Sequence, residues 1–281
     1  MKDVLNVAAY KFAELDDASH LCPSIRAEAQ TRGLKGTVLL ASEGINLVLA
    51  GDPQALRDYI AWLRIDDRLT DLIARESWSP FVPFARLRVT FKREIIRMDR
   101  PAVRPADQRA PAVGAAALAR WLDTGHDDEG RPVVMLDTRN AFEVAHGAFD
   151  GALDWRLARF GDFPAALAAH GAELRGKTVV TYCTGGIRCE KTSAWMRDME
   201  LPVYQLEGGI LNYFQQVPDA HLDWRGECFV FDNRVSLDTR LQETSTTLDD
   251  VYGAEADGAW RLARARRLAL AGRPAAEKSV P

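Results

Sequence analysis

The sequence predicts an α/β protein of two domains, an N-terminal α+β domain followed by a domain built on a doubly wound parallel sheet. The chain has 281 residues, more than the roughly 100–200 residues usual for one domain. In the first 96 residues, apolar runs and amphipathic stretches follow the order β-α-β-β-α-β. From residue 115 onward, apolar strands alternate with helical segments, which indicates a parallel sheet with helices on both faces.

The first domain, residues 1–96, has the element order of the ferredoxin-like fold, a layer of helices on an antiparallel sheet. Strands are expected over residues 4–12, 36–41, 44–50 and 86–92, with a further edge strand near Leu72. Asp16-Asp17 can cap the first helix, which runs to about Ala29, and Asp52-Pro53 opens the second. Four apolar residues at helical spacing support the second helix: Leu56, Tyr59, Ile60 and Leu63.

Residues 97–114 are expected to form an Arg/Pro-rich linker. They mix arginines with prolines and contain few large apolar residues: Arg97, Arg100, Arg104, Arg109, Pro101, Pro105 and Pro111. Since prolines favour an extended backbone, one interpretation is a solvated tether. The alternative is a strip of arginines that contacts a phosphate backbone.

The second domain, residues 115–221, alternates helices and strands. Helices are expected at 115–123, after Thr138-Arg139-Asn140, at 163–173 and at 188–199; strands are expected at 133–136, 178–182 and 203–206. The strand at 178–182 is apolar almost throughout, as strands buried in parallel sheets are. Reactive sites in such sheets lie beyond the carboxyl ends of the strands, so we expect the site after residue 182.

Residues 222–281 are expected to form a partly disordered C-terminal extension. A further strand is predicted at 228–231. Beyond about Asp238 the chain is polar and ends in a group of basic residues: Arg261, Arg264, Arg266, Arg267, Arg273 and Lys278. This part is expected to be weakly ordered or to form a loosely docked helix.

Composition and charge exclude several classes of protein. A net charge of −4 gives no global positive field, so any contact with nucleic acid has to come from local basic patches. No apolar run reaches the about 18–20 residues of a membrane helix, and the first residues lack the layout of a signal peptide. The four cysteines show no C-x-x-C pairing, so a cytoplasmic protein with reduced thiols is expected. The scattered histidines and the absence of a nucleotide-binding glycine motif predict neither a metal site nor a nucleotide cofactor.

One short loop, between a buried strand and a helix, contains the residues on which we expect the chemistry to depend. Its members are Cys183, Thr184, Gly185, Gly186, Ile187 and Arg188. Unpaired N–H groups at a helix N-terminus favour an anion, and two glycines let the backbone turn several of them toward one point. A cysteine there should have a lowered thiol pKa, and Arg188 and Lys191 add positive charge. We therefore expect a cradle for a thiolate, a persulfide or an oxyanion, rather than an inert core cysteine.

The residues that follow this loop have two interpretations each. Cys189 could resolve an oxidised Cys183 by forming a disulfide, or it could pack beneath the loop. Glu190 and Lys191 could support the site, but an exposed pair on the helix surface is slightly favoured. The two remaining cysteines are expected to lie in the core: Cys22 and Cys228.

The loop resembles the active-site loop of rhodanese domains, in which the first cysteine carries a persulfide. A second segment supports this resemblance, with Asp137, Arg139 and Glu143 followed by the run from Gly147 to Ala152. It is similar to the rhodanese signature of Asp-x-Arg, then Glu, then Gly-His-Ile-x-Gly-Ala. The signature's histidine is replaced by Ala148, and a histidine, His146, stands two places earlier. The resemblance spans about residues 114–220 and implies a rhodanese-like domain there.

Three longer strings resemble a narrower family, the bacterial tRNA uridine(34) hydroxylases. They run from Gly36 to Asn46, from Tyr182 to Lys191 and from Cys228 to Asp232, and the resemblance covers about residues 1–237. It implies conversion of wobble uridine to 5-hydroxyuridine in the anticodon loop of tRNA, with dioxygen as co-substrate and no evident cofactor. It implies neither DNA nor a membrane as a partner. Some branches of the family add a cysteine-rich C-terminal segment, but no cysteine follows Cys228 here, so no zinc is expected.

This resemblance suggests how a tRNA would be held. The first domain and the linker would grip the anticodon arm while a flipped uridine enters a pocket above Cys183. Three aromatic residues are candidates for stacking on bases, with core packing as the alternative: Trp78, Phe81 and Phe84. Glu43 and Asn46 could reach the nucleotide or the Cys183 loop, with turn formation as the alternative.

Three functions remain possible on the sequence alone. The first is an oxidoreductase that hydroxylates uridine 34, with Arg188 and the loop amides stabilising an anionic or oxidised Cys183. The second is a sulfurtransferase that carries a persulfide on Cys183 and passes sulfur to an acceptor. The third is a non-catalytic module that binds phosphate or RNA, which the presence of Cys183 disfavours. We expect the first, with the sulfurtransferase as the alternative.

Overall fold

The computed structural model describes residues 4–100, 102–107, 109–198, 202–253 and 258–270. The chain divides into two compact units. Unit 1 comprises residues 1–95, 231–233 and 247–281, and unit 2 comprises residues 96–230 and 234–246. The sequence-based expectations for Met1-Lys2-Asp3, Pro101, Arg273 and Lys278 lie outside the described residues.

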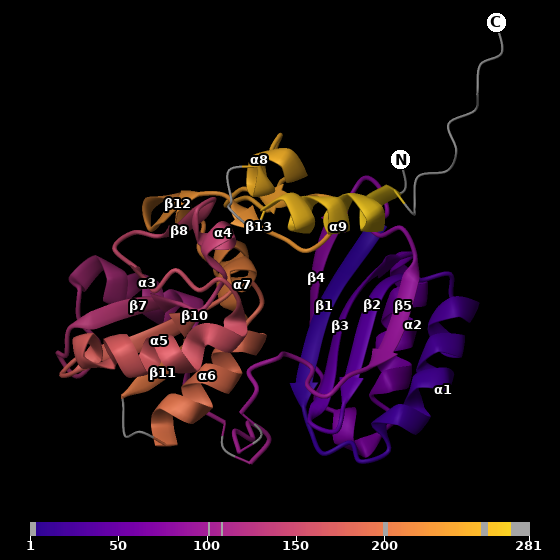
Figure 1. Cartoon of the computed structure of the whole chain (residues 1–281), viewed down its shortest axis with the longest axis horizontal. Helices are drawn as coiled ribbons and strands as arrows, with labels where there is room; N and C mark the ends of the chain where they lie inside the picture. Colours follow the sequence, from indigo (N-terminus) through magenta and orange to yellow (C-terminus); the bar gives the residue numbers. More distant parts are fainter. Residues whose placement is uncertain (1–3, 101, 108, 199–201, 254–257, 271–281) are drawn as a thin grey trace, which may run out of the picture. The chain divides into compact units, whose positions relative to one another are not determined.

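Unit 1 is built on a five-stranded sheet with two helices packed on one face (Figure 1). Its strands are β1 (Val4–Phe12), β2 (Lys35–Ala41), β3 (Gly44–Gly51), β4 (Ala74–Ser79) and β5 (Leu87–Phe91), in the order β4-β1-β3-β2-β5. The helices are α1 (Ala18–Thr31) and α2 (Pro53–Leu63), with a 3-10 turn, η1, at Asp67–Leu69. The elements from β1 to β4 form the predicted ferredoxin-like motif.

The fourth strand of this motif is not the one that the sequence predicted. Strand β4 pairs antiparallel with β1 and completes the motif, whereas β5, expected to close it, lies at the opposite edge and runs parallel to β2. The sheet is therefore mixed rather than antiparallel throughout. The sequence of β4 (ARESWS) shows little apolar alternation, because this edge strand is only partly buried.

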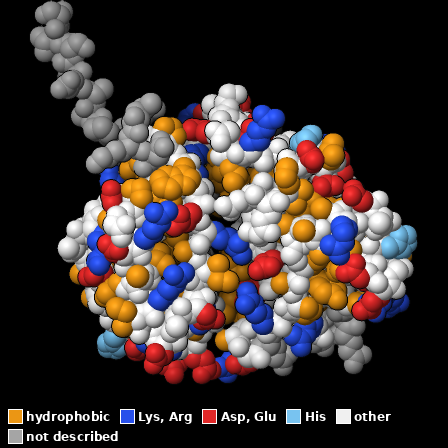
Figure 2. All heavy atoms as spheres, turned by 180° about the vertical axis from the view of Figure 1, so that it is seen from behind, with side chains coloured by type: hydrophobic (Ala, Val, Ile, Leu, Met, Phe, Trp, Pro, Cys, Tyr) orange, Lys and Arg blue, Asp and Glu red, His pale blue; other side chains and the backbone are white. Residues whose placement is uncertain are grey.

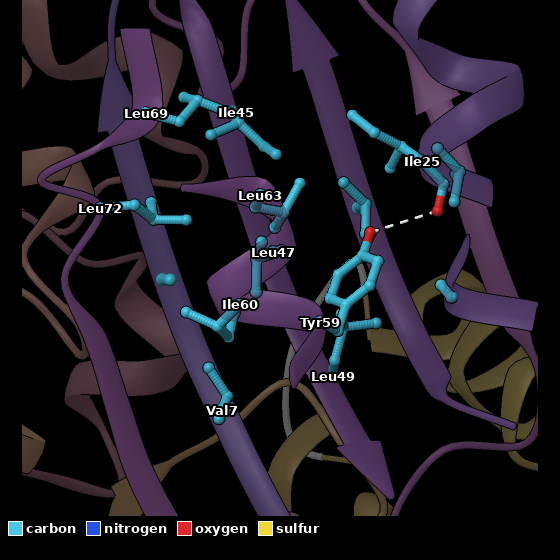
Figure 3. Packing of buried hydrophobic residues seen from close by; sticks show 14 of the residues in the cluster. Val7, Ile25, Ile45, Leu47, Leu49, Tyr59, Ile60, Leu63, Leu69 and Leu72 are labelled. Carbon is cyan, nitrogen blue, oxygen red and sulfur yellow. Dashed lines mark hydrogen bonds between the residues drawn. The ribbon is translucent and has the colours of Figure 1, made fainter. Parts of the chain in front are cut away.

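Alternate residues of the central strands form the core of unit 1. Val7 of β1 and Leu47 of β3 lie beside Tyr59 and Ile60 of α2, as Figure 3 shows. The Tyr59 hydroxyl donates a hydrogen bond to the carbonyl of Ile25 in α1 at 3.2 Å, so the two helices are joined within the core. The apolar face predicted for α2 is buried, which confirms the pattern read from its spacing.

The aspartates expected to start the two helices behave differently. The Asp52 carboxylate accepts hydrogen bonds from the N–H groups of Gln54 and Ala55, both at 3.1 Å, and caps α2 as predicted. Asp17 does not cap α1 through its side chain, because its carboxylate is paired with Arg68 at 2.5 Å. Arg68 lies 51 residues further along the chain, so local sequence could not reveal this competition.

The C-terminal part of the chain belongs largely to unit 1. Helices α8 (Leu248–Tyr252) and α9 (Gly258–Leu270) lie in this unit, and so do residues 231–233. There the N–H of Asn233 donates to the carbonyl of Pro83 at 3.0 Å. The basic segment is therefore helical over its described part, while residues 271–281 lie outside the described residues. The domain boundaries drawn from the sequence remain predictions.

Unit 2 is built on a five-stranded parallel sheet in the order β6-β11-β10-β7-β9 (Figure 1). These strands are β6 (Ala112–Val113), β7 (Val133–Asp137), β9 (Leu153–Asp154), β10 (Thr178–Tyr182) and β11 (Val203–Leu206). The helices are α3 (Ala115–Thr124), α4 (Ala141–Val144), α5 (Phe163–His170), α6 (Ile187–Asp198) and α7 (Gly209–Gln216). Shorter elements are β8 (Gly147–Phe149), β12 (Trp224–Gly226), β13 (Cys228–Phe229), β14 (Ser236–Leu237), η2 (Phe160–Asp162), η3 (Gly171–Leu174) and η4 (Ala220–Leu222).

Successive residues of the central strands of unit 2 enter two separate apolar clusters. Met135 and Val180 pack in the cluster formed with α3 and α7. Leu136 and Val179 pack in the cluster formed with α5 and α6. Because neighbouring residues of a strand point to opposite faces, helices cover both faces of this sheet. This is the doubly wound arrangement that the alternating pattern predicted, and the fold class is confirmed.

The residues predicted to form a linker are engaged within unit 2. Ala112–Val113 is strand β6 and pairs with β11. The linker arginines contact acidic or aromatic side chains: Arg97 with Asp99, Arg100 with Trp195, Arg104 with Asp107, and Arg109 with Glu190. Arg97, Arg104 and Arg109 are nonetheless exposed, so contact with a phosphate backbone stays a prediction.

The surface shows no segregation of charge on the face drawn in Figure 2. Lysine and arginine side chains there are scattered among acidic and apolar ones, in keeping with the small net charge of −4.

Among the helices in the described part of the chain, none is long and apolar enough to span a membrane.

Candidate active site

The candidate site lies at the carboxyl edge of the parallel sheet of unit 2. Cys183 follows directly on β10, and α6 begins four residues later, at Ile187. The Cys183 side chain is buried, and so are Gly186 and Arg188, whereas Thr184, Gly185 and Ile187 are half-buried. No atom would lie within 4 Å of a Cβ at Gly185, so the loop is open at that point. This is the position in which doubly wound sheets hold their reactive groups.

Backbone N–H groups converge on the sulfur of Cys183. The N–H of Gly186 donates to Sγ at 3.1 Å, and the N–H groups of Arg188 and Cys189 also favour its charged form. Gly186 has a φ of +98°, a conformation that a residue with a Cβ rarely adopts. The loop therefore directs several N–H groups at one sulfur, the arrangement that an anion cradle requires, and binding of an anion there stays a prediction.

A second glycine pair, missed by sequence reasoning, supports this loop from outside. At the start of α7, the N–H of Ile210 donates to the carbonyl of Cys183 at 3.0 Å, and that of Leu211 donates to Thr184 at 3.2 Å. Gly209 has a φ of +69°, and a Cβ there would lie 2.3 Å from the Cys183 carbonyl oxygen. The adjacent glycines Gly208 and Gly209 after an apolar strand were the available signal, since they indicate a close approach of two backbones.

A buried ion pair flanks the loop. Both guanidinium nitrogens at the tip of Arg188 donate to the Glu143 carboxylate, at 2.7 and 2.8 Å, and neither side chain is more than 7% exposed. Burial opposes the charge on Glu143, but Arg188 holds the pKa of this carboxyl below its ordinary value. Glu143 also accepts the N–H of Asn140 at 3.1 Å, which fixes it at the start of α4. The sequence had placed Glu143 in the rhodanese signature without giving it a role.

The environment of Cys183 makes its sulfur acidic. Burial alone would raise its pKa, but the hydrogen bond from the Cys189 thiol, the charge of Arg188 and the backbone N–H groups lower it to about 5. Cys189 responds in the opposite direction, because burial and its hydrogen bond to the Cys183 sulfur raise the pKa of its thiol. The environment thus favours the charged form of Cys183 and the protonated form of Cys189.

Cys189 is held beside Cys183 by a threonine of the neighbouring strand end. The Thr138 hydroxyl donates to the carbonyl of Tyr182 at 2.9 Å and lies 3.6 Å from the Cys189 sulfur. The structure therefore brings together Cys183, Cys189 and Arg188. Cys189 is fully buried, as packing beneath the loop requires, and its role as a resolving thiol stays a prediction.

The prediction of an exposed Glu190–Lys191 pair is wrong. Glu190 is 6% exposed and lies 3.5 Å from the guanidinium of Arg109, and Lys191 is 1% exposed. The Lys191 ammonium donates to the carbonyl of Ile96 at 3.1 Å. Helix α6 is buried between the sheet and the segment that precedes β6, and the sequence could not show that this segment covers it.

Comparison with known proteins identifies the family. The model of the UPF0176 acylphosphatase like domain matches residues 4–95, and that of the Rhodanese-like domain matches residues 115–216. A tRNA uridine(34) hydroxylase of Variovorax paradoxus is 58% identical over 84% of this chain and 90% of its own length. Those of Bordetella petrii and Delftia acidovorans are 58% and 56% identical, over 86% and 87% of this chain and 95% and 92% of theirs.

This chain belongs to the tRNA uridine(34) hydroxylase family. The family resemblance read from the three sequence strings is therefore confirmed, and so is the pairing of an acylphosphatase-like, ferredoxin-like domain with a rhodanese domain. The activity in the relatives' name is hydroxylation, so the comparison does not favour the sulfurtransferase alternative.

Residues outside the loop that were proposed as site members have other contacts in the structure. In unit 1, the Glu43 carboxylate accepts the N–H of Ile95 at 2.8 Å, and the Asn46 amide donates to the Ile95 carbonyl at 3.4 Å. Both side chains therefore hold the backbone at Ile95 in place. Trp78 and Phe81 are exposed, and Phe84 is half-buried, so core packing does not account for the first two.

The remaining cysteines and histidine are also placed. Cys228 is fully buried as predicted, whereas Cys22 is half-buried at the edge of the core of unit 1. His146 precedes β8, and its carbonyl accepts the N–H of Glu227 at 2.7 Å. Ala148, at the position where rhodaneses have histidine, is buried in β8. Within the described residues, no group of three or more His, Cys, Asp or Glu could hold a metal ion.

Proposed function

We propose that this chain hydroxylates C5 of uridine 34 in tRNA in an oxygen-dependent reaction, with Cys183 as the catalytic residue. The relatives that carry this activity in their name match between 84% and 87% of the chain. Dioxygen is the co-substrate, and the wobble base in the anticodon loop is the target. The cytoplasm is where we place the enzyme, because its tRNA substrate is used there.

One observation carries the proposal, namely the set of backbone N–H groups that converge on the Cys183 sulfur at the start of α6. The Cys183 sulfur accepts N–H groups of its own loop, and its pKa of about 5 makes it a thiolate at neutral pH. A thiolate is the form in which cysteine reacts with oxidants and electrophiles. The same donors stabilise an oxidised, anionic sulfur. Cys228 provides the contrast, because burial raises the pKa of its thiol to about 12.

The substrate base is accessible to such a site because it lies in a single-stranded loop. Proteins that act on a base draw it out of the stack, and an unpaired base costs least to extract. In unit 1, the exposed rings of Trp78 and Phe81 offer faces on which bases of the anticodon loop can stack. The guanidinium of Arg57 lies 5.9 Å from the Trp78 ring and is paired with the Glu76 carboxylate at 2.7 Å.

Nucleoside mass spectrometry of tRNA tests the proposal. Unmodified tRNA is incubated in air with the wild type, with Cys183→Ser, and with Cys22→Ser as a matched control outside the site. We expect one added oxygen on uridine 34 with the wild type and the control, and none with Cys183→Ser.

Full activity of Cys183→Ser would refute the role of this cysteine. No modified uridine with the wild type, together with cyanide-trappable sulfur on Cys183 after thiosulfate treatment, would instead establish the sulfurtransferase. The anion cradle would accommodate a persulfide equally well, so this second readout belongs in the same experiment.

A further inference from the structure

We propose that Cys183 and Cys189 act as a dithiol that supplies the two electrons of the hydroxylation and ends the turnover as a disulfide. This inference rests on the proposed function and identifies the electron source for the same site. Cys189 is then a reactant rather than a packing residue.

The electron balance of the reaction requires such a donor. Converting a C–H bond of uridine to C–OH with dioxygen consumes two electrons and two protons, because the second oxygen atom leaves as water. A thiolate and a thiol provide the two electrons and one of the protons, solvent provides the other proton, and one S–S bond forms. The sum is uridine plus dioxygen plus dithiol, giving 5-hydroxyuridine plus water plus disulfide. A small dithiol reductant then restores the thiols by exchange.

The geometry brings the two side chains together through Thr138. Both cysteines are free and buried, Cys183 being 1% exposed and Cys189 0% exposed, and the interaction between their side chains favours the charge on Cys183 and the proton on Cys189. The Thr138 hydroxyl, 3.6 Å from the Cys189 sulfur, is itself fixed to the Tyr182 carbonyl and holds the thiol in this position. The third buried cysteine, Cys228, has its sulfur 3.7 Å from the carbonyl oxygen of its neighbour Phe229.

The protonation states of the pair match this role. The thiolate at Cys183 is the nucleophile that is oxidised first, and Arg188 and the loop N–H groups stabilise its charge. Cys189 keeps its proton until the Cys183 sulfur is oxidised. The thiolate takes up dioxygen, one oxygen atom passes to C5 of uridine, and the other stays on the Cys183 sulfur as a sulfenate. The Cys189 sulfur then displaces this oxygen, which takes the Cys189 proton and one proton from solvent and leaves as water.

A single-turnover experiment on the wild type tests the inference. The protein is fully reduced, freed of small reductants without oxygen, and then mixed with tRNA in air. We expect one 5-hydroxyuridine per chain at most, with the loss of two thiols. A dithiol reductant such as dithiothreitol should restore repeated turnover.

Mass spectrometry of tryptic peptides can locate the disulfide, because trypsin cleaves after Arg188, between the two cysteines. Trypsin cleaves after Lys177, Arg188 and Lys191, so the disulfide would join the peptide 178–188 to the peptide 189–191. We expect this linked species, two hydrogens lighter than the two reduced peptides together, only when tRNA and oxygen are both present.

Variants separate this inference from the proposed function. Cys189→Ser should form no product above a few per cent of the wild-type single turnover, whereas Cys22→Ser should match the wild type. Product without the linked peptides, equal linkage without tRNA, or full single turnover by Cys189→Ser would each overturn the dithiol. Absence of 5-hydroxyuridine with every reductant would overturn the proposed function itself.

Discussion

Unit 2 contains two buried arginine–carboxylate pairs that share their chemistry and differ in their neighbours. Arg139 donates to Asp137 at 2.6 Å, and both side chains are fully buried. Arg188 donates to Glu143 at 2.7 and 2.8 Å and is almost as buried. Each carboxylate and each guanidinium would be costly to bury alone.

The neighbours of the two arginines explain what each pair does. Arg139 lies over the rings of Tyr182 and Trp224, 5.7 and 5.2 Å from their centroids, and donates to the carbonyl of Gly147 at 2.6 Å. It joins β7, β8, β10 and β12 from within the fold. Arg188 instead lies beside the Cys183 thiolate and lowers the pKa of that thiol. The comparison teaches that the neighbours of a buried ion pair decide whether it stabilises the fold or changes the reactivity of a nearby group.

Removing Arg139 should have the largest effect on the free energy of unfolding. Arg139→Met leaves Asp137 buried without its partner, so we expect the free energy of unfolding to fall by about 3–5 kcal/mol. Urea denaturation measures this, with Arg159→Ala as the control. Arg159 forms an exposed pair with Asp162 and should cost less than about 1 kcal/mol. If the double variant Asp137→Asn/Arg139→Met were no more stable than Arg139→Met, the orphaned carboxylate would not be the cause.

Removing the pair Arg188–Glu143 should lower the rate of hydroxylation. The double variant Glu143→Gln/Arg188→Met leaves neither member of the ion pair buried alone, so we expect it to fold and to lose about 10²–10³-fold in hydroxylation rate. The pKa of Cys183 should rise, because the charge of Arg188 no longer favours the thiolate. The rate of iodoacetamide alkylation as a function of pH measures that shift. An unchanged alkylation midpoint would show that the backbone N–H groups suffice.

A substitution at Gly209 should show how much the packing of α7 against the Cys183 loop contributes, without changing any charge. Gly209→Ala brings a Cβ to 2.3 Å from the Cys183 carbonyl oxygen, so we expect a loss of about 2–3 kcal/mol in unfolding free energy and a disturbed site. Gly176→Ala is the matched control, because Gly176 has a φ of +73° but no atom within 4 Å of its Cβ position. The control should lose only about 1 kcal/mol. Equal losses would mean that conformation rather than crowding decides.

The pH dependence of the free energy of unfolding should follow the Cys183 thiolate. The folded-state pKa of Cys183, about 5, lies below the ordinary value of a thiol, so its contribution to stability is present above about pH 8.5 and lost as pH falls toward 5. We therefore expect the stability difference between wild type and Cys183→Ser to shrink over this range. Thermal unfolding at several pH values measures it. A difference independent of pH would mean that Cys183 is not a thiolate in the folded protein.

The sequence predicted most of the fold because its signals are local. Asp52-Pro53 before an apolar stripe indicated α2, and the continuous apolar run at Thr178–Tyr182 indicated a strand buried on both faces. The family and its hydroxylase activity were read from short strings and are confirmed by the relatives. Local signals failed where a partner far along the chain decided the outcome, as Arg68 did for Asp17.

The features of the candidate site also fall into those that local sequence determines and those that distant partners decide. By itself, the sequence determined that a cysteine followed by two glycines stands between a buried strand and a helix, since this depends only on chain neighbours. Only the tertiary structure decided that Glu143 neutralises Arg188 across 45 residues, that Thr138 holds Cys189 across 51, and that Lys191 is buried. The physical reason is that burial and charge pairing depend on which segments the sheet brings together, and that arrangement is a property of the whole fold.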